Sequence, residues 1–357
     1  MLSVINSNLR QQPFSSPAHT VAAAVDEFLI RQPDFNSPIS VVRDAVPTKL
    51  PHSIPPDSVI HIHGYNGAIR LPELAQAGEN RRVVWTLHDM NPFTGACHYS
   101  LGCTQFRNRC AACPAVRSPF HNIVRRALQE KIHVVKNLKD LVVIAPSPWL
   151  AQEAEQSSVF AGQSVSVIPN PFSQEFEEFR VNGKNAPQQS PHSTFRLAVV
   201  AANLSDPVKN VGEAIQAFQR VRRARENFEL HLVGKGGAEF VGEGITHRGP
   251  IPRDQMAEFF ARCDILVIPS LAENSPLVIA EAASQGCSVI VRNSGGMPDV
   301  VSSLGHGDVY SHRDELENVL QRVTAAAPPQ RRQIATRASE LFGPQIIAEQ
   351  YDGVYDD

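Results

Sequence analysis

The second half of the chain alternates short apolar runs, rich in β-forming residues, with segments of helical periodicity. This alternation is typical of a parallel sheet covered by helices, because parallel strands are joined by helical crossovers. The pattern therefore predicts an α/β fold for this half. The predicted strands are Arg196–Ala201, Glu229–Val233, Ile265–Ile268 and Ser288–Val291, with a weaker one at Ile245–Arg248, and the predicted helices are Val211–Arg223, Asp254–Ala261 and Pro276–Gln285.

The first half shows the same alternation, so we predict two Rossmann-like domains. A length of 357 residues with 42% hydrophobic content suits two domains of about 100–200 residues each. Residues 181–194 are rich in turn formers and nearly devoid of apolar residues, which predicts a linker. We place the domains at 1–180 and 195–340, followed by a C-terminal helix at 341–357 that packs back on the first domain. The predicted strands of the first half are Leu2–Asn6, Ser58–His63, Val83–Leu87, Leu141–Ala145 and Ser164–Ile168.

Charge and hydropathy exclude several classes of partner. The chain has 33 basic and 36 acidic residues, so no whole-chain field attracts nucleic acid, and we expect no nucleic-acid partner. No apolar run approaches the roughly 20 residues that span a bilayer, and the N-terminus lacks the pattern of a secretion signal. We therefore expect a cytoplasmic protein.

The segment Ile123–Leu138 combines helical spacing of apolar residues with several basic side chains. The simplest interpretation is a solvated helix face, and the alternative is a weak peripheral contact with the inner face of a membrane. The basic residues in or beside this segment are Arg125, Arg126, Lys131, Lys136 and Lys139.

A polar segment follows the predicted strand Ile265–Ile268, at the edge of the sheet where α/β proteins bind ligands. Its Ser275-Pro276 pair predicts the start of a helix, because serine caps helices and proline fits the first turn. The free N–H groups and the positive end of such a helix can hold a phosphate group. Further along, Glu281 lies among apolar neighbours, and a carboxylate in such surroundings needs a partner.

Glu273 and Glu281, which are separated by seven residues across this turn, resemble the paired-glutamate motif of family-four retaining glycosyltransferases. The segments Asn274–Leu277 and Ala282–Gly286 also match that family's pattern. The resemblance implies a GT-B fold, in which two Rossmann-like domains face a central cleft. It also implies a nucleotide-sugar donor in the C-terminal half and no requirement for a catalytic metal.

The resemblance implies roles for the residues of this motif. Glu273 would accept a hydrogen bond from a donor-sugar hydroxyl, and Glu281 would hold the ribose hydroxyls of the nucleotide. Asn274 belongs to the same donor-binding segment. The backbone amides of Ser275 and Leu277 would face the sugar and the diphosphate, whereas Pro276 has no N–H to offer.

Three other segments match donor-side positions of the family. Lys209 corresponds to its phosphate-binding lysine, whose charge would neutralise the diphosphate leaving group. The family often has an arginine near the position of Asn203, so phosphate neutralisation here depends more on Lys209. Gly234 and Lys235 lie in a glycine-rich turn that lets a nucleotide approach the backbone closely, although such turns are also ordinary loops. Ile251 occupies the loop that offers backbone groups to the base.

The first half carries the predicted acceptor side. His88 and Asp89 end the strand Val83–Leu87, and His88 resembles the family's cleft histidine, which would contact the donor sugar or the acceptor while Asp89 orients it. The alternative is a strand end with a satisfied histidine. His63 shares a strand face with His61 and is expected to line the cleft. The family's glycine-rich first turn corresponds to residues 15–20, which contain no glycine, so His19 or Thr20 is expected to substitute through its side chain.

Four cysteines cluster in a loop at residues 97–113. Four soft ligands that include a Cys-x-x-Cys pair predict a tetrahedral structural zinc. Free or redox-active thiols are the alternative. The cluster also resembles a cysteine insertion of a family-four subset associated with surface polysaccharide assembly. The predicted ligands are Cys97, Cys103, Cys110 and Cys113.

Together these patterns predict a retaining glycosyltransferase that moves a sugar from a nucleotide-sugar donor to a saccharide, glycolipid or lipid-linked glycan. We expect a UDP-sugar rather than a GDP-sugar. One alternative is a sugar-nucleotide epimerase or hydrolase of the same fold, since a fold does not determine its chemistry. Another is a catalytically silent binding subunit, which Asn203 and the glycine-free first loop would favour.

Overall fold

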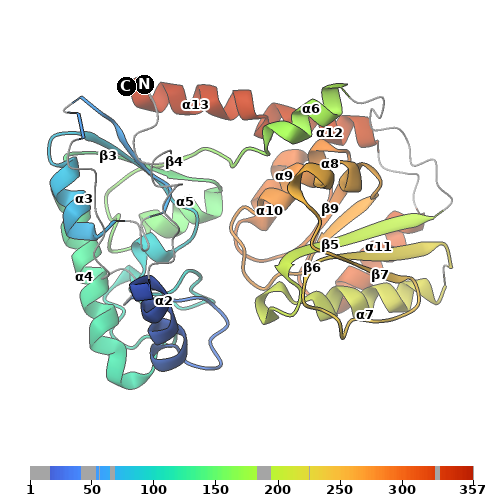
Figure 1. The fold of residues 1–357 in the computed structure, drawn as a ribbon, viewed down its shortest axis with the longest axis horizontal. Helices are drawn as coiled ribbons and strands as arrows, with labels where there is room; N and C mark the ends of the chain where they lie inside the picture. Colours follow the sequence, from blue (N-terminus) through green and yellow to red (C-terminus); the bar gives the residue numbers. More distant parts are fainter. Residues whose placement is uncertain are drawn as a thin grey trace. The chain divides into compact units, whose positions relative to one another are not determined.

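The computed structural model divides the chain into two compact units (Figure 1). The first unit comprises residues 1–168 with 351–357, and the second comprises 169–350. The predicted strand Leu2–Asn6 and most of the predicted linker lie outside the described residues. The structure describes residues 17–41, 54–55, 57–64, 69–182, 194–224, 226–325 and 330–356.

The second unit contains a parallel sheet whose strand order is β10-β9-β8-β5-β6-β7. β5 lies in the middle, and the chain first builds outward through β6 and β7 before it returns to place β8 on the other side of β5. The strand order therefore reverses between β5 and β8, as it does in doubly wound folds. The strands are β5 (Phe195–Asn203), β6 (Phe228–Lys235), β7 (Ile245–Gly249), β8 (Ile265–Ile268), β9 (Ser288–Arg292) and β10 (Asp308–Tyr310).

Helices cover both faces of this sheet (Figure 1). The sequence of β8 is continuously apolar because both of its faces are buried. Ile265 packs into the core on one face, and Leu266 packs into the core on the other. One face carries α7 (Val211–Arg222) and α11 (Arg313–Ala325), and the other carries α8 (Arg253–Ala261), α9 (Leu277–Ser284), α10 (Met297–Leu304) and α12 (Arg331–Phe342).

The boundary between the units follows Ile168, whereas the sequence placed the end of the first domain at residue 180. The reason is hydrophobic burial. Phe172 and Phe176, which lie before and within α6 (Gln174–Asn182), are 1% exposed and pack in the second unit's core with Phe260. Removing these two phenyl rings from water stabilises the arrangement in which Phe172 and Phe176 belong to the second unit.

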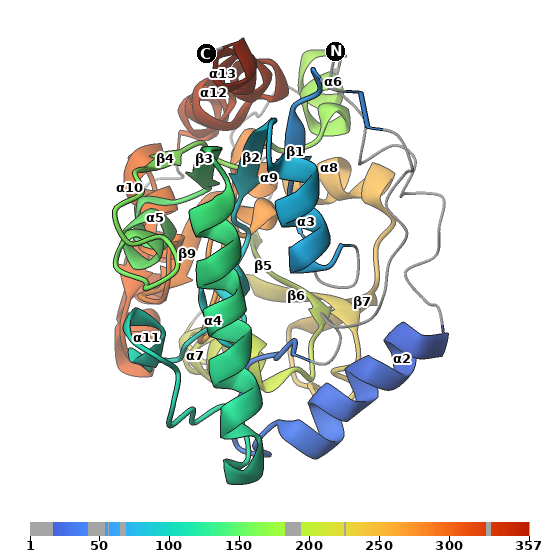
Figure 2. The ribbon, with the colours of Figure 1, turned by 90° about the vertical axis from the view of Figure 1, so that its left-hand side faces the viewer.

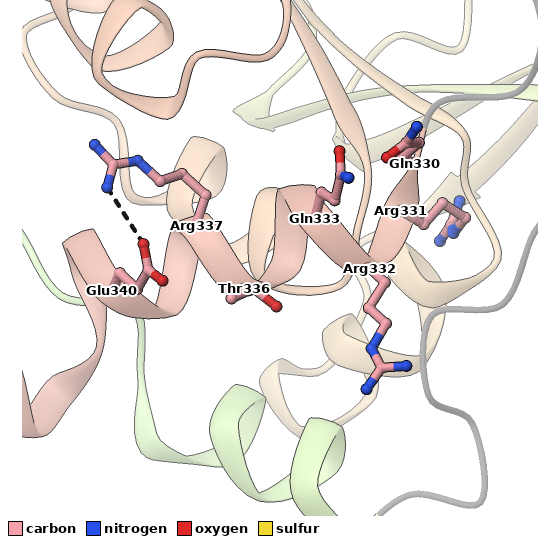
Figure 3. A pocket seen from close by; sticks show the side chains of 7 residues that line it. All are labelled: Gln330, Arg331, Arg332, Gln333, Thr336, Arg337 and Glu340. Carbon is pink, nitrogen blue, oxygen red and sulfur yellow. Dashed lines mark hydrogen bonds and ion pairs between the residues drawn. The ribbon is translucent and has the colours of Figure 1, made fainter.

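A buried arginine at the start of α12 ties together the ends of two other helices. The Arg331 side chain donates hydrogen bonds to the carbonyl oxygens of Ala261 (2.8 Å) and Gln285 (3.1 Å), at the C-terminal ends of α8 and α9. These carbonyls lack partners within their own helices, and a cation suits that end of a helix. Further along α12, Arg337 pairs with Glu340 beside an open hollow (Figure 3).

The first unit contains, in its described part, a parallel sheet of order β1-β2-β3-β4. Trp85 is fully buried at its centre. The strands are β1 (Ile60–Ile62), β2 (Arg82–Thr86), β3 (Asp140–Ala145) and β4 (Val165–Val167), and the helices are α2 (Pro17–Ala24) with its π-helical continuation Val25–Ile30, α3 (Leu71–Gly78), α4 (His121–Asn137) and α5 (Pro148–Glu155), labelled in Figure 2.

The end of α13 (Pro344–Asp356) belongs to the first unit. The hydroxyl of Tyr351 lies 3.0 Å from Thr86 Oγ1, and that of Tyr355 lies 2.6 Å from His61 Nδ1. Arg82 also donates to the carbonyl oxygen of Val354. These polar contacts attach the last residues of the chain to β1 and β2.

The basic segment predicted as a solvated helix corresponds to α4. Arg125, Arg126 and Lys136 are exposed on it, but Lys131 is not: it is 1% exposed, and its Nζ donates to the carbonyl oxygens of Asn91 (2.7 Å) and Thr94 (2.8 Å). A buried ammonium needs such acceptors, so Lys131 holds a loop rather than contributing to a basic surface. Among the described residues, no helix has the length and apolar character needed to cross a membrane.

Candidate functional site

Lys209 and Glu273 form an ion pair at the point where the strand order of the second sheet reverses. Lys209 ends the 3₁₀ turn Pro207–Lys209, which follows β5, and Glu273 follows β8. The Nζ of Lys209 donates to Oε1 of Glu273. Because β5 and β8 are neighbours, the pair lies at the carboxyl edge of the sheet, where α/β proteins bind ligands.

Hydrogen bonds join the loops that carry these two residues. The N–H of Leu271 donates to the carbonyl oxygen of Val208 (2.8 Å), and Asn210 Nδ2 donates to the carbonyl oxygen of Pro269 (3.2 Å). Asn210 has φ 51°, a left-handed conformation that asparagine tolerates well, and it lets the chain turn from Lys209 into α7. The positions of Lys209 and Glu273 are therefore fixed by the backbone around them.

A glycine turn after β9 supports Glu273 from the other side. The N–H of Gly296 donates to the carbonyl oxygen of Glu273 (3.2 Å). Gly295 has φ 57°, and a Cβ atom there would lie 1.8 Å from that same oxygen, so only glycine fits. The sequence analysis missed this support. The signal was present, since turn formers at residues 293–296 follow the predicted strand Ser288–Val291 directly.

Glu281 lies on α9 and is 9% exposed. Its burial raises the pKa of this carboxyl group, and the nearby Arg253 opposes that effect. Arg253 Nη2 lies 3.5 Å from Glu281 Oε1, and Arg253 itself is largely exposed at the start of α8. The sequence did not indicate this partner, because 27 positions separate it from Glu281 and nothing in the pattern links them.

The start of α9 differs from the prediction. We expected Ser275 to cap this helix, but α9 begins at Leu277, with Pro276 at the N-cap position and no side-chain cap among the described residues. The carbonyl oxygen of Ser275 accepts a hydrogen bond from Asn170 (3.1 Å), which holds the preceding turn. An N-terminus without a side-chain cap suits an anionic ligand. Asn274 is 2% exposed beside it.

The other donor-side residues form a second turn at the same edge of the sheet. Asn203 Oδ1 accepts the N–H of Ser205, and the carbonyl oxygen of Lys235 accepts the N–H of Leu204 (2.8 Å). At Gly234, a Cβ atom would lie 1.9 Å from the carbonyl oxygen of Ala201. The close approach that this glycine permits is therefore made by the chain's own backbone.

Ile251, predicted to contact the base, lies in a different place from these turns. It lines a pocket between α8 and the sheet, together with Arg248.

Three histidines of the predicted acceptor side contact one another in the first unit. His63 Nδ1 lies 3.1 Å from His88 Nε2, and the His61 and His63 ring centroids are 4.0 Å apart. Partial burial and neighbouring imidazoles lower the pKa of His61 to about 3 and that of His63 to about 4, so both rings are neutral at pH 7. His19 lies in α2, and its side chain is outside the described part of the structure.

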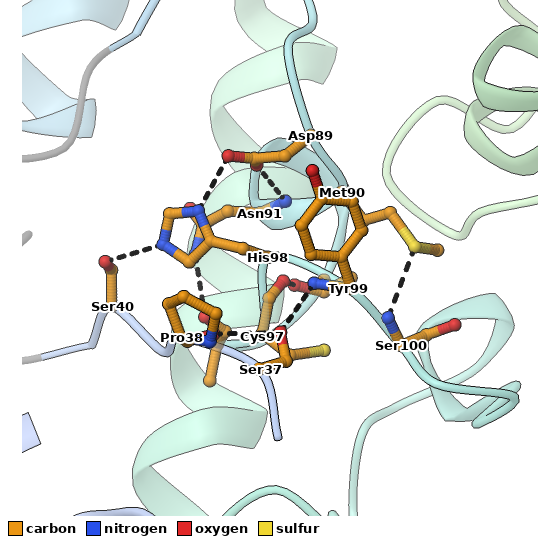
Figure 4. A network of polar contacts seen from close by, with 12 residues as sticks. Ser37, Pro38, Ser40, Asp89, Met90, Asn91, Cys97, His98, Tyr99 and Ser100 are labelled. Atoms are coloured by element: carbon orange, nitrogen blue, oxygen red, sulfur yellow. Dashed lines mark hydrogen bonds and ion pairs between the residues drawn. The ribbon is translucent and has the colours of Figure 1, made fainter. Parts of the chain in front are cut away.

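Asp89 belongs to a network that the sequence analysis did not predict (Figure 4). Its Oδ2 lies 2.7 Å from His98 Nδ1, and its Oδ1 accepts the N–H of Asn91 (2.7 Å). His98 Nε2 lies 2.9 Å from Ser40 Oγ. We expected Asp89 to orient His88, but both of its carboxylate oxygens are engaged by other groups. Asp89 thus fixes the loop that follows His88.

The four clustered cysteines line one small cavity with Phe35 and Phe106. Burial raises the pKa of Cys97, Cys110 and Cys113, in the case of Cys110 to about 12, so these thiols are protonated at pH 7. Within the described ranges, no three or more Cys, His, Asp or Glu side chains are arranged to hold a metal ion. The four thiols thus line one cavity without forming such a group among the described residues.

A family model matches part of the second unit. Residues 195–326 match the model described as glycosyl transferases group 1. The second unit is therefore similar to group 1 glycosyltransferases over this range, which is less than half of the chain. Every predicted donor-binding residue, from Asn203 to Glu281, lies within the matched range.

Similar proteins cover both halves of the chain. The Escherichia coli (strain K12) protein WcaC, whose description concerns colanic acid biosynthesis, is 24% identical over 286 residues, which are 76% of this chain and 68% of that protein. The lipopolysaccharide 1,2-N-acetylglucosaminetransferase of Salmonella typhimurium is 27% identical over 222 residues. That alignment spans 57% of each protein, so the chain matches only about half of the Salmonella enzyme.

Solved structures show the fold of the two units. Sucrose-phosphate synthase from Thermosynechococcus elongatus has a TM-score of 0.60 at 19% identity, covering 84% of this chain and 73% of that one. Anabaena HepE in complex with UDP and glucose has a TM-score of 0.55 at 19% identity, with coverage of 84% and 77%. The predicted fold class, two parallel-sheet α/β domains of GT-B type, is confirmed.

Proposed function

We propose that the chain is a retaining glycosyltransferase that moves a sugar from a UDP-sugar to a saccharide or lipid-linked glycan acceptor during surface polysaccharide assembly. The group 1 match supports the reaction class. The relatives described for colanic acid biosynthesis and for lipopolysaccharide support the acceptor class. The fold relative that was solved with UDP supports uridine as the base.

The observation that carries the proposal is the Lys209–Glu273 pair beside the start of α9. One cation, one carboxylate and the N-terminus of a helix lie at the edge of the sheet where ligands bind in this type of fold. A nucleotide-sugar needs these groups, because its diphosphate is anionic and its sugar hydroxyls donate hydrogen bonds. The bonded loops around them hold the groups in place before the donor arrives.

In this proposal Lys209 acts on the leaving group. The bond between the sugar and the diphosphate breaks during transfer, and negative charge then grows on the diphosphate oxygen. The ammonium of Lys209 and the amides at the start of α9 stabilise that charge. Glu273 accepts a hydrogen bond from the sugar, while Glu281 holds the ribose. Since the diphosphate charge is met by these groups, we propose that transfer needs no divalent cation.

The histidines of the first unit supply the acceptor side in this proposal. His88 is exposed at the end of β2, and its Nε2 is within hydrogen-bonding distance of His63. Because His63 is neutral, the pair can exchange hydrogen bonds with sugar hydroxyls without introducing positive charge. We propose that His88 contacts the transferred sugar or the acceptor, with the Asp89 network holding its loop.

Product analysis tests the proposal. The purified chain would be incubated with a panel of UDP- and GDP-sugars, with and without saccharide acceptors, and with EDTA in a parallel series. We expect a new glycoside of unchanged anomeric configuration from a UDP-sugar only when acceptor is present, and no effect of EDTA. A product that forms without acceptor would indicate an epimerase or hydrolase. Donor binding without any product would indicate a silent binding subunit.

A further inference from the structure

A second pocket of the C-terminal unit lies between α8 and the β5-β6-β7 side of the sheet and encloses about 380 Å³. Three cationic side chains contribute to its lining. Arg196 comes from β5, Arg248 from β7, and Arg262 from the end of α8. The remaining lining includes His231, Gln255 and Phe259.

The Arg196 end of this pocket lies away from the Lys209–Glu273 site. Arg196 is the second residue of β5, whereas Lys209 lies beyond the carboxyl end of that strand. A strand rises by about 3.3 Å per residue, so the far end of β5 at Asn203 is about 23 Å from Arg196. The glycosyl transfer proposed above gives no role to Arg196, Arg248 or Arg262, although Ile251, which was predicted to contact the base, also lines the pocket.

His231 provides a buried hydrogen-bond donor in this pocket. Its ring is 4% exposed, and its Nδ1 accepts a hydrogen bond from Arg248 Nε (3.2 Å), which places the ring proton on Nε2. The Nε2 atom faces the Glu229 carboxylate, whose Oε2 lies 3.5 Å away. His231 therefore links Glu229 to Arg248 and helps to hold the Arg248 guanidinium in the pocket.

The charges of the pocket do not cancel. Arg196 lies 3.6 Å from Glu229, and Arg262 pairs with Glu258. Arg248 has no carboxylate partner within the described ranges, so its two terminal amino groups remain available. Three guanidinium groups against two carboxylates leave a net positive charge, and a guanidinium binds phosphate through two parallel hydrogen bonds.

We propose that this pocket binds a phosphorylated monosaccharide, with the phosphate on Arg248 and the sugar along α8. Phe259 offers an aromatic surface to the apolar face of a pyranose ring, and Gln255 and Glu258 offer groups that pair with hydroxyls. The volume lies within the range of about 300–1,000 Å³ that small-molecule sites occupy. The site goes beyond the proposed transferase activity, and its test requires no transfer.

Isothermal titration of the chain with a hexose 6-phosphate tests the proposal, with inorganic phosphate and the unphosphorylated hexose as comparison ligands. We expect saturable binding of the phosphate ester and weaker binding of both comparison ligands. Arg248→Gln should weaken binding by at least about tenfold, since an ionic hydrogen bond contributes roughly that factor. Arg223→Gln, which changes an exposed arginine at the end of α7, is the matched control and should bind as the parent does.

Two further measurements decide where the ligand binds. Lys209→Ala should keep full affinity for the hexose phosphate, and Arg262→Gln should weaken it as Arg248→Gln does. If Lys209→Ala loses binding and Arg248→Gln keeps it, the ligand occupies the donor site and the proposal is overturned. Inorganic phosphate that binds as tightly as the ester would overturn the assignment of a sugar, and no binding at millimolar concentration would overturn the site.

Discussion

Lys209 and Glu273 neutralise each other in the structure, and this has a consequence for catalysis. A donor diphosphate must compete with Glu273 for the ammonium of Lys209, while the sugar hydroxyl competes for the carboxylate. Both groups are partly buried, with side chains 28% and 14% exposed, so the pair is only partly screened by water. When the donor binds, the Lys209–Glu273 ion pair is therefore replaced by two contacts with the donor, one from each residue.

Replacing Lys209 tests its proposed role on the leaving group. Lys209→Ala should lower turnover by on the order of a hundredfold or more, because deleting one electrostatic donor at a developing charge has that typical cost. Lys209→Arg should restore part of the activity, since it keeps the charge. Steady-state kinetics on the folded variants measures both. Lys136→Ala, on the exposed side of α4, is the control.

The alternative for Lys209 is a purely structural partner of Glu273. In that case Lys209→Ala would retain more than about half of the parental turnover. Loss of a leaving-group contact would instead leave about a hundredth of it or less. A purely structural role would be seen as a lower melting temperature of the variant.

Glu281 makes nucleotide binding sensitive to pH. An ionised carboxylate accepts hydrogen bonds from ribose more strongly than a protonated carboxyl group does, and burial raises the pKa of Glu281. The affinity for UDP should therefore fall as the pH is lowered, at a higher pH than for an ordinary glutamate. Calorimetry should show this fall in the parent and a smaller one in Glu281→Gln.

Comparing the parent with Glu281→Gln cancels the effect of the titration of UDP itself, because both proteins bind the same ligand. Glu281→Ala should bind UDP more weakly than the parent at pH 7, whereas Glu273→Ala should mainly lower turnover. Equal UDP affinity of Glu281→Ala and the parent would reject the ribose assignment.

At the scale of elements, the central strands of the second sheet, such as β8, could be predicted from sequence because they are buried on both faces. The prediction for β8, Ile265–Ile268, agrees at both ends, and β5, β6 and β9 agree within two residues. β10 was missed, since Asp308–Tyr310 is short and contains one buried apolar side chain, Tyr310. A continuous apolar run is a strong signal, and a three-residue edge strand is not.

The polar contacts of the candidate site could be predicted only where motifs follow strands. That rule placed Glu273, Lys209 and His88 at strand ends. It could not pair Asp89 with His98 and Ser40, because Ser40 precedes His98 by 58 positions and no periodicity connects them. Such contacts depend on how loops fold over one another, which is a tertiary property.

Gly295 provides a test of the turn that supports Glu273. Gly295→Ala should lower the free energy of unfolding by more than about 2 kcal/mol, because the residue has φ 57° and its Cβ would overlap the Glu273 carbonyl oxygen. It should also reduce turnover by displacing Glu273. Denaturant unfolding and kinetics measure the two effects.

Gly212→Ala is the matched control for this substitution. Gly212 lies in α7 with open space around its missing Cβ, so alanine there should stabilise the chain by about 0.5–1 kcal/mol. If Gly295→Ala were as stable and as active as the parent, the turn would not position Glu273.

Zinc in the cysteine loop remains a prediction. The four thiols line one cavity, which brings four soft ligands together in one loop. We expect one zinc per chain, and loss of soluble protein when Cys110 and Cys113 are both changed to serine. Elemental analysis of protein purified under reducing conditions without chelator decides the question, and absence of stoichiometric metal would reject it. Cys287→Ser, remote from the loop, should keep the metal.

At the scale of the whole chain, the first unit combines the early strands β1 and β2 with the last residues of α13. On β1, His61 Nδ1 lies 2.6 Å from the hydroxyl of Tyr355, and His61 Nε2 lies 2.8 Å from Thr86 Oγ1. Tyr351 reaches the same threonine. The last residues of α13 therefore cover the strands that carry the histidine cluster, and the cluster's environment depends on them.

This arrangement predicts that the first unit loses stability in mild acid. The pKa of His61 is about 3 and that of His63 about 4 in the folded chain, whereas the ordinary histidine value is 6.5. Below pH 6.5 the two imidazoles bind protons in the unfolded chain but stay neutral in the folded chain. The free energy of unfolding therefore falls as the pH drops. The loss should run from about pH 6.5 to about pH 3, the folded pKa of His61, and level off below it. Thermal unfolding of the parent and of His61→Gln across this range should show a shallower pH dependence in the variant.

His312→Gln, which changes an exposed histidine of the second unit, is the control and should behave as the parent does. Identical pH dependence in the parent and His61→Gln would mean that His61 has the same pKa in the folded and the unfolded chain, which would contradict the lowered pKa of the cluster.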